Sequence, residues 1–316
     1  MPRPAPRPAR ECPGLEASAG YIVGESDRLI LEEASHSLET RAMGVDFQDR
    51  HMKKIFIVTD LEGVAGVVSF SDQSSPDGRY YDAARKLLTA EVNAAIEGML
   101  SSGVEEILVW DGHGAGAISF EDLHPAATLL HGRPMPPWSR LREVIRRYEA
   151  VVMIGQHAMA GTLTGNQNHT QNSRTIDYYR LNGRPIGETA QIALYFGALG
   201  LPLIFLSGDL DACREAQELA AGISVVAVKE GVGRAAAISL SAPEARRRIC
   251  AGVRQAIEQQ RANPIPPLVW EGPYVLEKRY FHTDVADAAA AQPGVERVDS
   301  QTVRIRGDDI LELIYR

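Results

Sequence analysis

Short runs of apolar residues alternate with longer stretches of helical periodicity from Met52 to the end of the chain. The runs are rich in Val, Ile, Leu and Phe, and each is bounded by Gly, Pro or an acidic residue. Continuous apolar runs of this length are typical of strands that are buried on both faces, as in a parallel sheet. We therefore predict strands at Ile55–Thr59, Glu106–Trp110, Val151–Ile154, Leu203–Leu206 and Val225–Val228.

Amphipathic helices are predicted in three of the intervals between and after these strands. The segment at 80–103 has apolar residues at helical spacing and ends at Gly103, a residue type that commonly follows the last turn of a helix. The segment at 187–200 repeats this pattern, and the segment at 241–259 begins with a Ser and an early Pro. Alternating strands and helices predict an α/β fold with three layers, in which helices flank a mostly parallel sheet.

Two segments depart from this alternation. Asn182-Gly183 lies between two extended arms, and this dipeptide is the strongest local signal for a β-hairpin with a two-residue turn. The hairpin leads directly to Glu188 at the start of the next helix. After a Pro-rich link, residues 265–316 show an alternating strand pattern and a short closing helix. We therefore predict a larger α/β domain at 52–264, with the hairpin as an insertion, and a small C-terminal α+β subdomain at 265–316.

The first 51 residues differ from the rest of the chain. They begin with the Pro/Arg-rich stretch "MPRPAPRPARECPG", which is unsuited to regular structure, and they lack the continuous apolar segment of a secretory signal. Met52 runs through two lysines straight into the first strand, as a natural start would. We expect the working protein to begin near Met52, with residues 1–51 a disordered extension, a tolerated tail or a start-site artefact.

Composition and charge narrow the class of protein. The 316 residues are 45% hydrophobic and 23% charged, which is ordinary for a soluble globular chain. The net charge of −8 argues against a nucleic-acid or anionic-membrane partner, and no apolar run approaches the roughly 18 residues of a membrane span. Cys12, Cys213 and Cys250 are widely spaced and form no CxxC pattern, so a reducing compartment, the cytoplasm, is expected.

Acidic and histidine residues follow several of the predicted strands. The carboxyl ends of parallel strands meet at one edge of a sheet, where ligands bind in folds of this kind. The strand ends and the hairpin supply these residues: Asp60, Glu62, Asp111, His113, His157 and Glu188. One catalytic zinc needs only three protein ligands, whereas two imidazoles and three carboxylates suit two metals about 3.5–4 Å apart. A mixed nitrogen and oxygen set without thiolate favours zinc, with manganese or cobalt also suitable.

Simpler interpretations exist for single residues of this kind. A lone Asp after a strand is commonly a turn former or a helix cap, and a lone His is commonly structural. We assign such structural roles to His124, His131 and His282, and a helix cap to Asp209. Lys229 and Arg234 also follow a strand, and they are predicted to be solvated charges. Asp111 is left with two alternatives, which are a contact to a substrate amine and a partner that orients His113.

Four motifs resemble those of the D-aminopeptidase family of zinc peptidases. "TDLEG" at 59–63 is similar to the family pattern S/T-x-D-x-E-G, and "VWDGHG" at 109–114 to V-x-D-x-H. "IGQHAMAG" at 154–161 is similar to G-x-H-A, and "NGRPIGETA" at 182–190 to N-x-x-P-x-G-E. The motifs occur in the family's order at nearly its spacing, and the resemblance extends from Met52 to the C-terminus.

The resemblance implies a site and an activity. Its metal ligands would be Asp60, Glu62, His113, His157 and Glu188, holding two zinc ions with Asp60 as the bridge. His169, in "TGNQNHTQNS", matches a histidine implicated in the family's catalysis, as a general acid or as a group that stabilises the oxyanion. Metal-activated water would then release N-terminal residues, D-amino acids in particular, from short peptides. The family forms a homodecamer, so a closed homo-oligomer is expected.

Two other functions remain open at this stage. One is a different metal-dependent amide or ester hydrolase on the same scaffold, because one fold supports many substrates. The other is a non-catalytic binding or assembly protein that is stabilised by its metal. His169 discriminates between catalysis and binding, because a structural metal site has no need of an additional proton donor.

Overall fold

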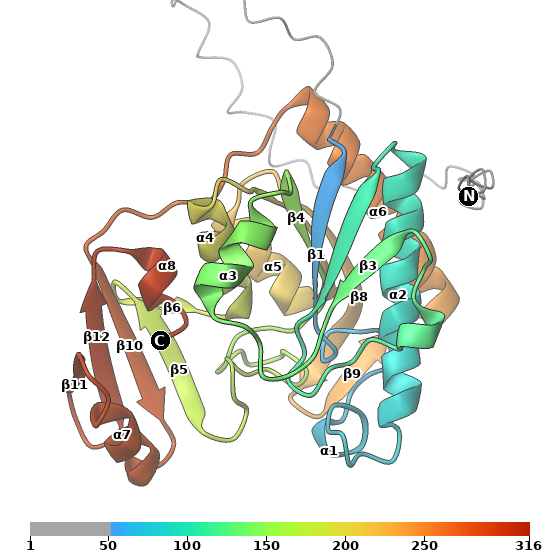
Figure 1. Cartoon of the computed structure of the whole chain (residues 1–316). Helices are drawn as coiled ribbons and strands as arrows, with labels where there is room; N and C mark the ends of the chain where they lie inside the picture. Colours follow the sequence, from blue (N-terminus) through green and yellow to red (C-terminus); the bar gives the residue numbers. More distant parts are fainter. Residues whose placement is uncertain (1–51) are drawn as a thin grey trace, which may run out of the picture. The chain divides into compact units, whose positions relative to one another are not determined.

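The computed structural model of the chain describes residues 52–316, so the predictions for residues 1–51 and for Cys12 lie outside the described residues. Two sheets and their helices make up the described part (Figure 1). None of the helices within residues 52–316 combines the length and the apolar character that crossing a membrane requires. Cys213 is a buried thiol in helix α5 (Leu210–Leu219).

A seven-stranded sheet has the order β3-β2-β1-β4-β7-β8-β9, and every neighbouring pair is parallel except β8 with β9. Five of its strands match the predicted ones and are longer by one or more residues. They are β1 (Lys54–Thr59), β2 (Glu106–Asp111), β4 (Ala150–Gln156), β7 (Leu203–Asp209) and β8 (Ser224–Gly233). The two edge strands, β3 (Ala127–Leu130) and β9 (Ala236–Ser239), were not predicted, because they are short and only half-buried.

Helices cover both faces of this sheet, which confirms the predicted three-layer α/β fold (Figure 1). Alternate residues of β1 divide between two hydrophobic clusters. Ile55 and Ile57 pack with α2 (Tyr81–Ser101) and α6 (Ala242–Ala262), whereas Phe56 and Val58 share a cluster with the helices of the opposite face. The latter helices are α3 (Trp138–Ile145), α4 (Glu188–Ala198) and α5. Continuous apolar strands follow directly from burial on both faces.

The predicted hairpin belongs to a second, antiparallel sheet of order β11-β12-β10-β5-β6. Its strands are β5 (Ile176–Leu181), β6 (Arg184–Ile186), β10 (Tyr274–Tyr280), β11 (Val295–Arg297) and β12 (Thr302–Gly307). Asn182 and Gly183 have φ angles of 50° and 79°, as the predicted turn requires. The hairpin therefore shares a sheet with the C-terminal strands, and the domain boundary at 264 stays a prediction.

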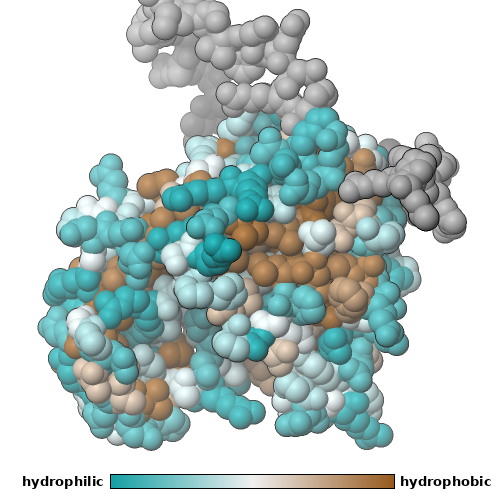
Figure 2. All heavy atoms as spheres, in the orientation of Figure 1, coloured by the Kyte–Doolittle hydropathy of each residue, from teal (hydrophilic) through white to brown (hydrophobic). Residues whose placement is uncertain are grey.

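Short helices complete both regions. α1 (Phe70–Gln73) and the 3₁₀ helix η1 (Phe120–Asp122) lie in loops of the larger region, and α7 (Thr283–Ala290) and α8 (Ile310–Leu313) accompany the second sheet. On the face seen in Figure 2, apolar residues gather in the middle of the molecule, and hydrophilic residues surround them.

The ends of β1 and β4 approach each other closely because glycines lie there. A Cβ atom at Gly63 would lie 2.0 Å from the carbonyl oxygen of Gln156. Gly155 has a φ of +82°, and a Cβ there would lie 2.0 Å from the carbonyl oxygen of Asp60. Only glycine permits this approach, which brings the residues after β1 next to those after β4.

Candidate metal centre

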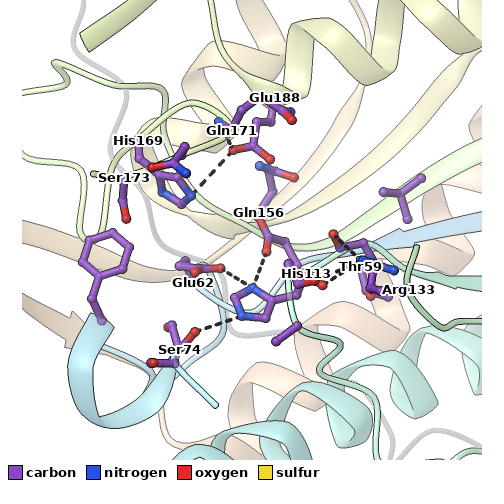
Figure 3. A pocket seen from close by; sticks show the side chains of 18 of the residues that line it. Thr59, Glu62, Ser74, His113, Arg133, Gln156, His169, Gln171, Ser173 and Glu188 are labelled. Atoms are coloured by element: carbon purple, nitrogen blue, oxygen red, sulfur yellow. Dashed lines mark hydrogen bonds and ion pairs between the residues drawn. The ribbon is translucent and has the colours of Figure 1, made fainter. Parts of the chain in front are cut away.

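The five residues expected to bind metal converge at the carboxyl edge of the seven-stranded sheet. Glu62, His113 and Glu188 are seen in Figure 3. Asp60 and Glu62 follow β1, His113 follows β2, His157 follows β4, and Glu188 is the first residue of α4. The first four are buried, and the side chain of Glu188 is 21% exposed. Residues that span more than a hundred positions in the sequence thus form one cluster.

The two carboxylate oxygens of Asp60 face different imidazoles. Asp60 Oδ1 lies 3.2 Å from Nδ1 of His113, which also lies 3.0 Å from Oε2 of Glu62. Asp60 Oδ2 lies 3.1 Å from Nε2 of His157, which lies 3.4 Å from Oε1 of Glu188. Asp60 therefore lies between two groups of donor atoms, the position that a bridging carboxylate occupies.

Backbone carbonyls fix which nitrogen of each histidine faces the carboxylates. Nε2 of His113 donates to the carbonyl oxygen of Ser74 at 3.0 Å, and Nδ1 of His157 donates to that of Ala158 at 2.9 Å. The other nitrogen of a neutral imidazole then presents a lone pair to carboxylate oxygens, which is repulsive unless a cation lies between them. Metal-bound histidines are commonly held by such a hydrogen bond from the opposite ring nitrogen.

The spacing of the donor atoms fits a metal ion. Nitrogen and oxygen ligands at about 2.0–2.2 Å from a tetrahedral zinc lie roughly 3.3–3.5 Å from each other. The separations at both imidazoles, 3.0–3.4 Å, are close to these values. Nε2 of His157 is fully buried and has no hydrogen-bond partner of good geometry among residues 52–316. The residues present therefore fit a divalent cation.

The electrostatics of the cluster favour positive charge. Burial opposes charging of His113, but the charge of Glu62 and hydrogen bonds to Asp60 and Glu62 raise its pKa to about 12. The pKa of His157 is likewise well above its usual range despite burial, because of Asp60 and Glu188. Burial would raise the pKa of Asp60, but its two histidine partners hold that pKa well below the usual value. A field that holds protons this strongly also attracts metal cations.

His169 lies next to this cluster. Its ring stacks on that of His157, with centroids 3.9 Å apart and planes at 14°. Nδ1 of His169 donates to the carbonyl oxygen of Gln167 at 2.9 Å, and Nε2 lies 3.7 Å from Oε1 of Glu188 (Figure 3). Donor atoms of His157, His169 and Glu188 lie within 4.8 Å of one another, as do those of Asp60, Glu62 and His157. Nε2 of His169 is thus available to a substrate or to a metal.

A pocket of about 710 Å³ opens above these residues. Its wall includes Phe70, Ser74, Arg133, Trp138, Gln171 and Tyr315, and its floor includes Asp60, Glu62, His113, His169 and Glu188. The volume falls within the roughly 300–1,000 Å³ of typical small-molecule sites. The pocket is therefore large enough for a short peptide.

Two of the sequence predictions around the site are wrong. Asp111 does not contact His113, because its two oxygens accept hydrogen bonds from the backbone N–H groups of Ala117 and Ile118 at 2.8 and 3.1 Å. Asp111 therefore shapes the loop after β2. Lys229 is not solvated but 2% exposed, because its ammonium group turns into the protein and donates to three buried oxygens. Burial lowers the pKa of Lys229 to about 8, although Asp209 and Glu62 oppose that shift.

The remaining structural assignments agree with the structure. Asp209 caps α5 by accepting a hydrogen bond from the N–H of Asp211 at 3.0 Å. His124 pairs with Glu97, His131 stacks on Phe120, and His282 precedes α7. Arg234 is exposed, and its guanidinium lies 4.8 Å from the centroid of the Phe70 ring.

Arg133 is a site residue that sequence analysis missed. Its Nη2 donates to the carbonyl oxygens of Asp111, Gly112 and His113, at 3.1, 3.3 and 2.8 Å, and its Nε donates to that of Gly114. The guanidinium thus holds the loop that carries His113. An arginine that acts on backbone carbonyls leaves no motif of residue types, so the sequence carried no signal for it.

Comparisons with known proteins point to one family. A model of the D-aminopeptidase family matches residues 52–315. A D-aminopeptidase of Bacillus subtilis (strain 168) is 30% identical over 263 residues, which cover 82% of this chain and 93% of that protein. Among solved structures, the Zn-dependent D-aminopeptidase DppA from Bacillus subtilis, described as a self-compartmentalizing protease, matches with a TM-score of 0.77 and 28% identity. That match covers 83% of this chain and 94% of DppA.

Proposed function

This chain belongs to the D-aminopeptidase family, and we propose that it is a two-zinc aminopeptidase that releases N-terminal residues, D-amino acids in particular, from short peptides. The observation that carries this proposal is the position of Asp60, whose two oxygens face two imidazoles with fixed tautomers. A single metal ion would not need both groups of donor atoms.

The donor atoms divide into two sets. Asp60 Oδ1, Glu62 and Nδ1 of His113 would hold one ion, and Asp60 Oδ2, Nε2 of His157 and Glu188 the other. Two zinc ions bound here would polarise the scissile carbonyl and lower the pKa of water, so that a nucleophile is available near neutral pH. Manganese or cobalt would suit the same donors.

His169 is the group of this chain best placed to move a proton. Its Nδ1–H is held by the carbonyl oxygen of Gln167, so Nε2 is the nitrogen that exchanges protons with a substrate. From there it would give a proton to the leaving amine or donate a hydrogen bond to the oxyanion. Asp111 is engaged with the loop backbone, so Glu62 and Glu188 are the pocket carboxylates left to face the substrate's α-amino group.

Membership of this family also suggests an oligomeric state and a cellular location for this chain. DppA is described as self-compartmentalizing, and we propose that this chain also forms a closed homo-oligomer, a homodecamer by family resemblance, in the cytoplasm. Its substrates would be peptides short enough to enter such an assembly. Light scattering coupled to size-exclusion chromatography measures the number of subunits directly.

The test combines zinc content with peptide hydrolysis. We expect about two zinc ions per chain after metal loading and dialysis, and release of D-Ala from D-Ala-D-Ala in preference to L-Ala from L-Ala-L-Ala. Asp60→Ala should lose zinc and lower kcat/KM on the order of 10³-fold, because Asp60 serves both positions. Asp82→Ala, which removes an exposed carboxylate of α2, is the matched control and should behave as wild type.

Other outcomes would indicate a different hydrolase or would contradict the proposed function. Zinc binding with hydrolysis of N-acyl or cyclic amides, but not of free-amine peptides, would indicate a different amidohydrolase on this scaffold. Failure to bind zinc after reconstitution would contradict the proposed function.

A further inference from the structure

A buried ammonium group lies directly behind the candidate metal centre. Lys229 belongs to β8, is 2% exposed, and donates to three oxygens. These are the backbone carbonyl of Glu62, the backbone carbonyl of Val67 at 2.6 Å, and Oδ1 of Asn166 at 2.8 Å. Because an ammonium group carries three N–H donors, the hydrogen-bonding capacity of Lys229 is fully used.

The three acceptors belong to the two loops that supply site residues. The carbonyls of Glu62 and Val67 lie in the loop after β1, which carries the Glu62 carboxylate. Asn166 lies in the loop between His157 and His169, which we call the histidine loop (residues 158–168). One cation thus joins the backbone of a proposed metal ligand to the loop that leads to His169.

Asn166 extends this connection to the histidine loop itself. It is fully buried, and its Nδ2 donates to the carbonyl oxygens of Val68 at 3.3 Å and Arg234 at 3.2 Å. The N–H of Gln167 donates to the same Arg234 carbonyl at 2.9 Å. The histidine loop is therefore bound both to the loop after β1 and to the turn that follows β8.

Close backbone contact holds the histidine loop against β8. A Cβ atom at Gly231, two residues after Lys229, would lie 1.9 Å from the carbonyl oxygen of Thr164 and 2.6 Å from the nitrogen of Asn166. No side chain fits between the two segments there. Lys229 therefore belongs to the part of β8 that lies against the histidine loop.

A buried acidic side chain, Glu91, also contacts the loop after β1, and burial raises its pKa to about 8. Oε1 of Glu91, in α2, accepts a hydrogen bond from the N–H of Ala65 at 3.0 Å. Two carbonyl groups of this loop therefore accept hydrogen bonds from Lys229, and one N–H group donates to Glu91. Burying an ionised group such as the ammonium of Lys229 is unfavourable, and its three hydrogen bonds are needed to offset that cost.

We propose that Lys229 is a positioning residue that fixes Glu62 and the histidine loop relative to each other. This inference rests on the proposed function, because it assigns Glu62 to a metal position. Lys229 touches neither the pocket nor the donor atoms, and it acts through the backbone of Glu62. Its effect should therefore be larger at the position formed by Glu62 and His113 than at the position formed by His157 and Glu188.

The test compares two buried lysines. Lys229→Met keeps the length of the side chain and removes the three hydrogen bonds. Lys278→Met is the matched control, because Lys278 is also buried but lies in the second sheet over the ring of Tyr179, 4.9 Å from its centroid. Zinc affinity is measured by competition with a chromophoric chelator, and kcat and KM with a D-dipeptide.

We expect Lys229→Met to weaken the binding of one of the two zinc ions by roughly 10–100-fold, the range found when residues behind metal ligands are changed. The value of kcat should fall at least tenfold while KM changes less, because the loss concerns the geometry of reacting groups. Lys229→Arg keeps the positive charge and its donors, and should restore part of the zinc affinity. Lys278→Met should keep wild-type affinity for both ions.

Loss of stability needs its own control, because Lys229→Met leaves buried acceptors without a donor. Val253→Ala removes two methyl groups from a fully buried position in α6, outside both loops, and is expected to lower the melting temperature by several degrees. A comparable fall in melting temperature with intact zinc affinity in this variant would exclude general destabilisation as the cause. If Lys229→Met does not fold, Asn166→Ala is tested instead: it leaves the bonds of Lys229 to Glu62 and Val67 in place, removes the bonds of Asn166 to Lys229, Val68 and Arg234, and should lower kcat.

The results separate this inference from the proposed function. Wild-type zinc affinity and kcat in Lys229→Met, or in Asn166→Ala when that variant is the one tested, would overturn the role of Lys229. Failure of the proposed activity at an intact metal site would appear in the wild type, as zinc binding without hydrolysis of peptides. The zinc measurement needs no substrate, so the role of Lys229 is still tested in that case, whereas a wild type that binds no zinc would overturn both proposals.

Discussion

The two sheets of this protein place their charged residues in opposite ways. The seven-stranded sheet is apolar along its strands and carries acids and histidines just beyond their carboxyl ends, where they are buried against one another. The five-stranded sheet carries charges along its strands, in cross-strand pairs that are partly exposed. Examples are Arg304 with Glu277 at 2.7 Å and Arg279 with Asp177 at 3.1 Å.

Strand geometry explains this difference. A parallel strand covered by helices on both faces has few solvent-facing positions, so charged groups lie mostly at or beyond its ends, and a charge within such a strand, as at Lys229 in β8, is buried with hydrogen-bond acceptors. β10 is antiparallel and its residues alternate between buried and half-exposed, so polar side chains fit on one of its faces. The first arrangement gathers charges from distant parts of the chain into a site, and the second distributes them over a surface.

A connection between the two regions carries a site residue. β6 ends at Ile186, and after Gly187 the chain enters α4 with Glu188. Through this connection the antiparallel sheet places one carboxylate in the site of the parallel sheet. Substitutions of matched residues inside and outside the site test this division of roles.

The largest difference in kcat/KM is expected between variants of two glutamates, Glu188 and Glu277. Glu188→Gln removes a carboxylate from a proposed metal position and should lower kcat/KM on the order of 10³-fold, with loss of one zinc ion. Glu277→Gln removes a carboxylate of similar exposure from the pair with Arg304, and should change kcat/KM by less than about twofold and stability by less than about 1 kcal/mol. Similar kinetic losses in both variants would contradict the division of roles between the sheets.

The next comparison concerns two histidines that both approach a glutamate. His169→Ala should lower kcat by at least about 10²-fold while two zinc ions remain bound, because it removes a proton donor and no ligand. His124→Ala, which removes the partner of Glu97, should leave kcat unchanged. Loss of a zinc ion in His169→Ala would instead make His169 a ligand of the position near Glu188.

The sequence predicted the parts of the fold that depend on local pattern. The central strands were found because burial on both faces makes them continuously apolar, and the hairpin because its turn requires positive φ at Asn182 and Gly183. The edge strands β3 and β9 lack such a pattern, whereas α3 is amphipathic but, at 8 residues, was too short to be recognised. The pairing of β5 with β10 joins segments about a hundred residues apart, and local periodicity carries no information about it.

The residues of the site also differ in whether a local sequence pattern revealed them. Asp60, Glu62, His113 and His157 were identified because they lie just after apolar strands, where an acid or a histidine stands out, and Glu188 because the predicted hairpin leads to it at the start of a helix. Lys229 and Arg133 were not identified, because they act on backbone carbonyls, and any residue type can supply a carbonyl. At the sequence level a lysine in a strand is indistinguishable from one that faces solvent.

The third prediction compares stability with function in the antiparallel sheet. Leu276 is fully buried in β10, and Leu276→Ala should lower the free energy of unfolding by about 2–5 kcal/mol through lost burial and a residual cavity. Zinc affinity should stay within about twofold of wild type, because β10 supplies none of the donor atoms. Chemical denaturation and chelator competition measure the two quantities. A large loss of zinc affinity would show that the second sheet supports the geometry of the site more directly than its contacts indicate.

The smallest expected effect is a pH-dependent change in stability caused by Lys278, the buried lysine of the antiparallel sheet. Burial, with a contribution from Arg316, lowers its pKa to about 8. No carboxylate of residues 52–316 lies within salt-bridge distance of its ammonium. Below pH 8 both the folded and the unfolded chain hold the proton, so the cost of the buried charge is present in full. Between about pH 8 and pH 10.5 the folded chain releases the proton while the unfolded chain retains it, so this lysine destabilises the fold less as pH rises.

Lys278→Met should therefore be more stable than wild type by about 2–3 kcal/mol at pH 7, and this difference should shrink as pH rises from 8 to 10. Urea unfolding of both proteins at a series of pH values measures it, and titration of other groups cancels in the comparison. A difference that stays constant with pH would mean that Lys278 keeps its charge in the folded protein, stabilised by the face of Tyr179. Lys278 would then resemble Lys229 in being a buried cation with a partner, and the contrast between the two sheets would rest on their carboxylates alone.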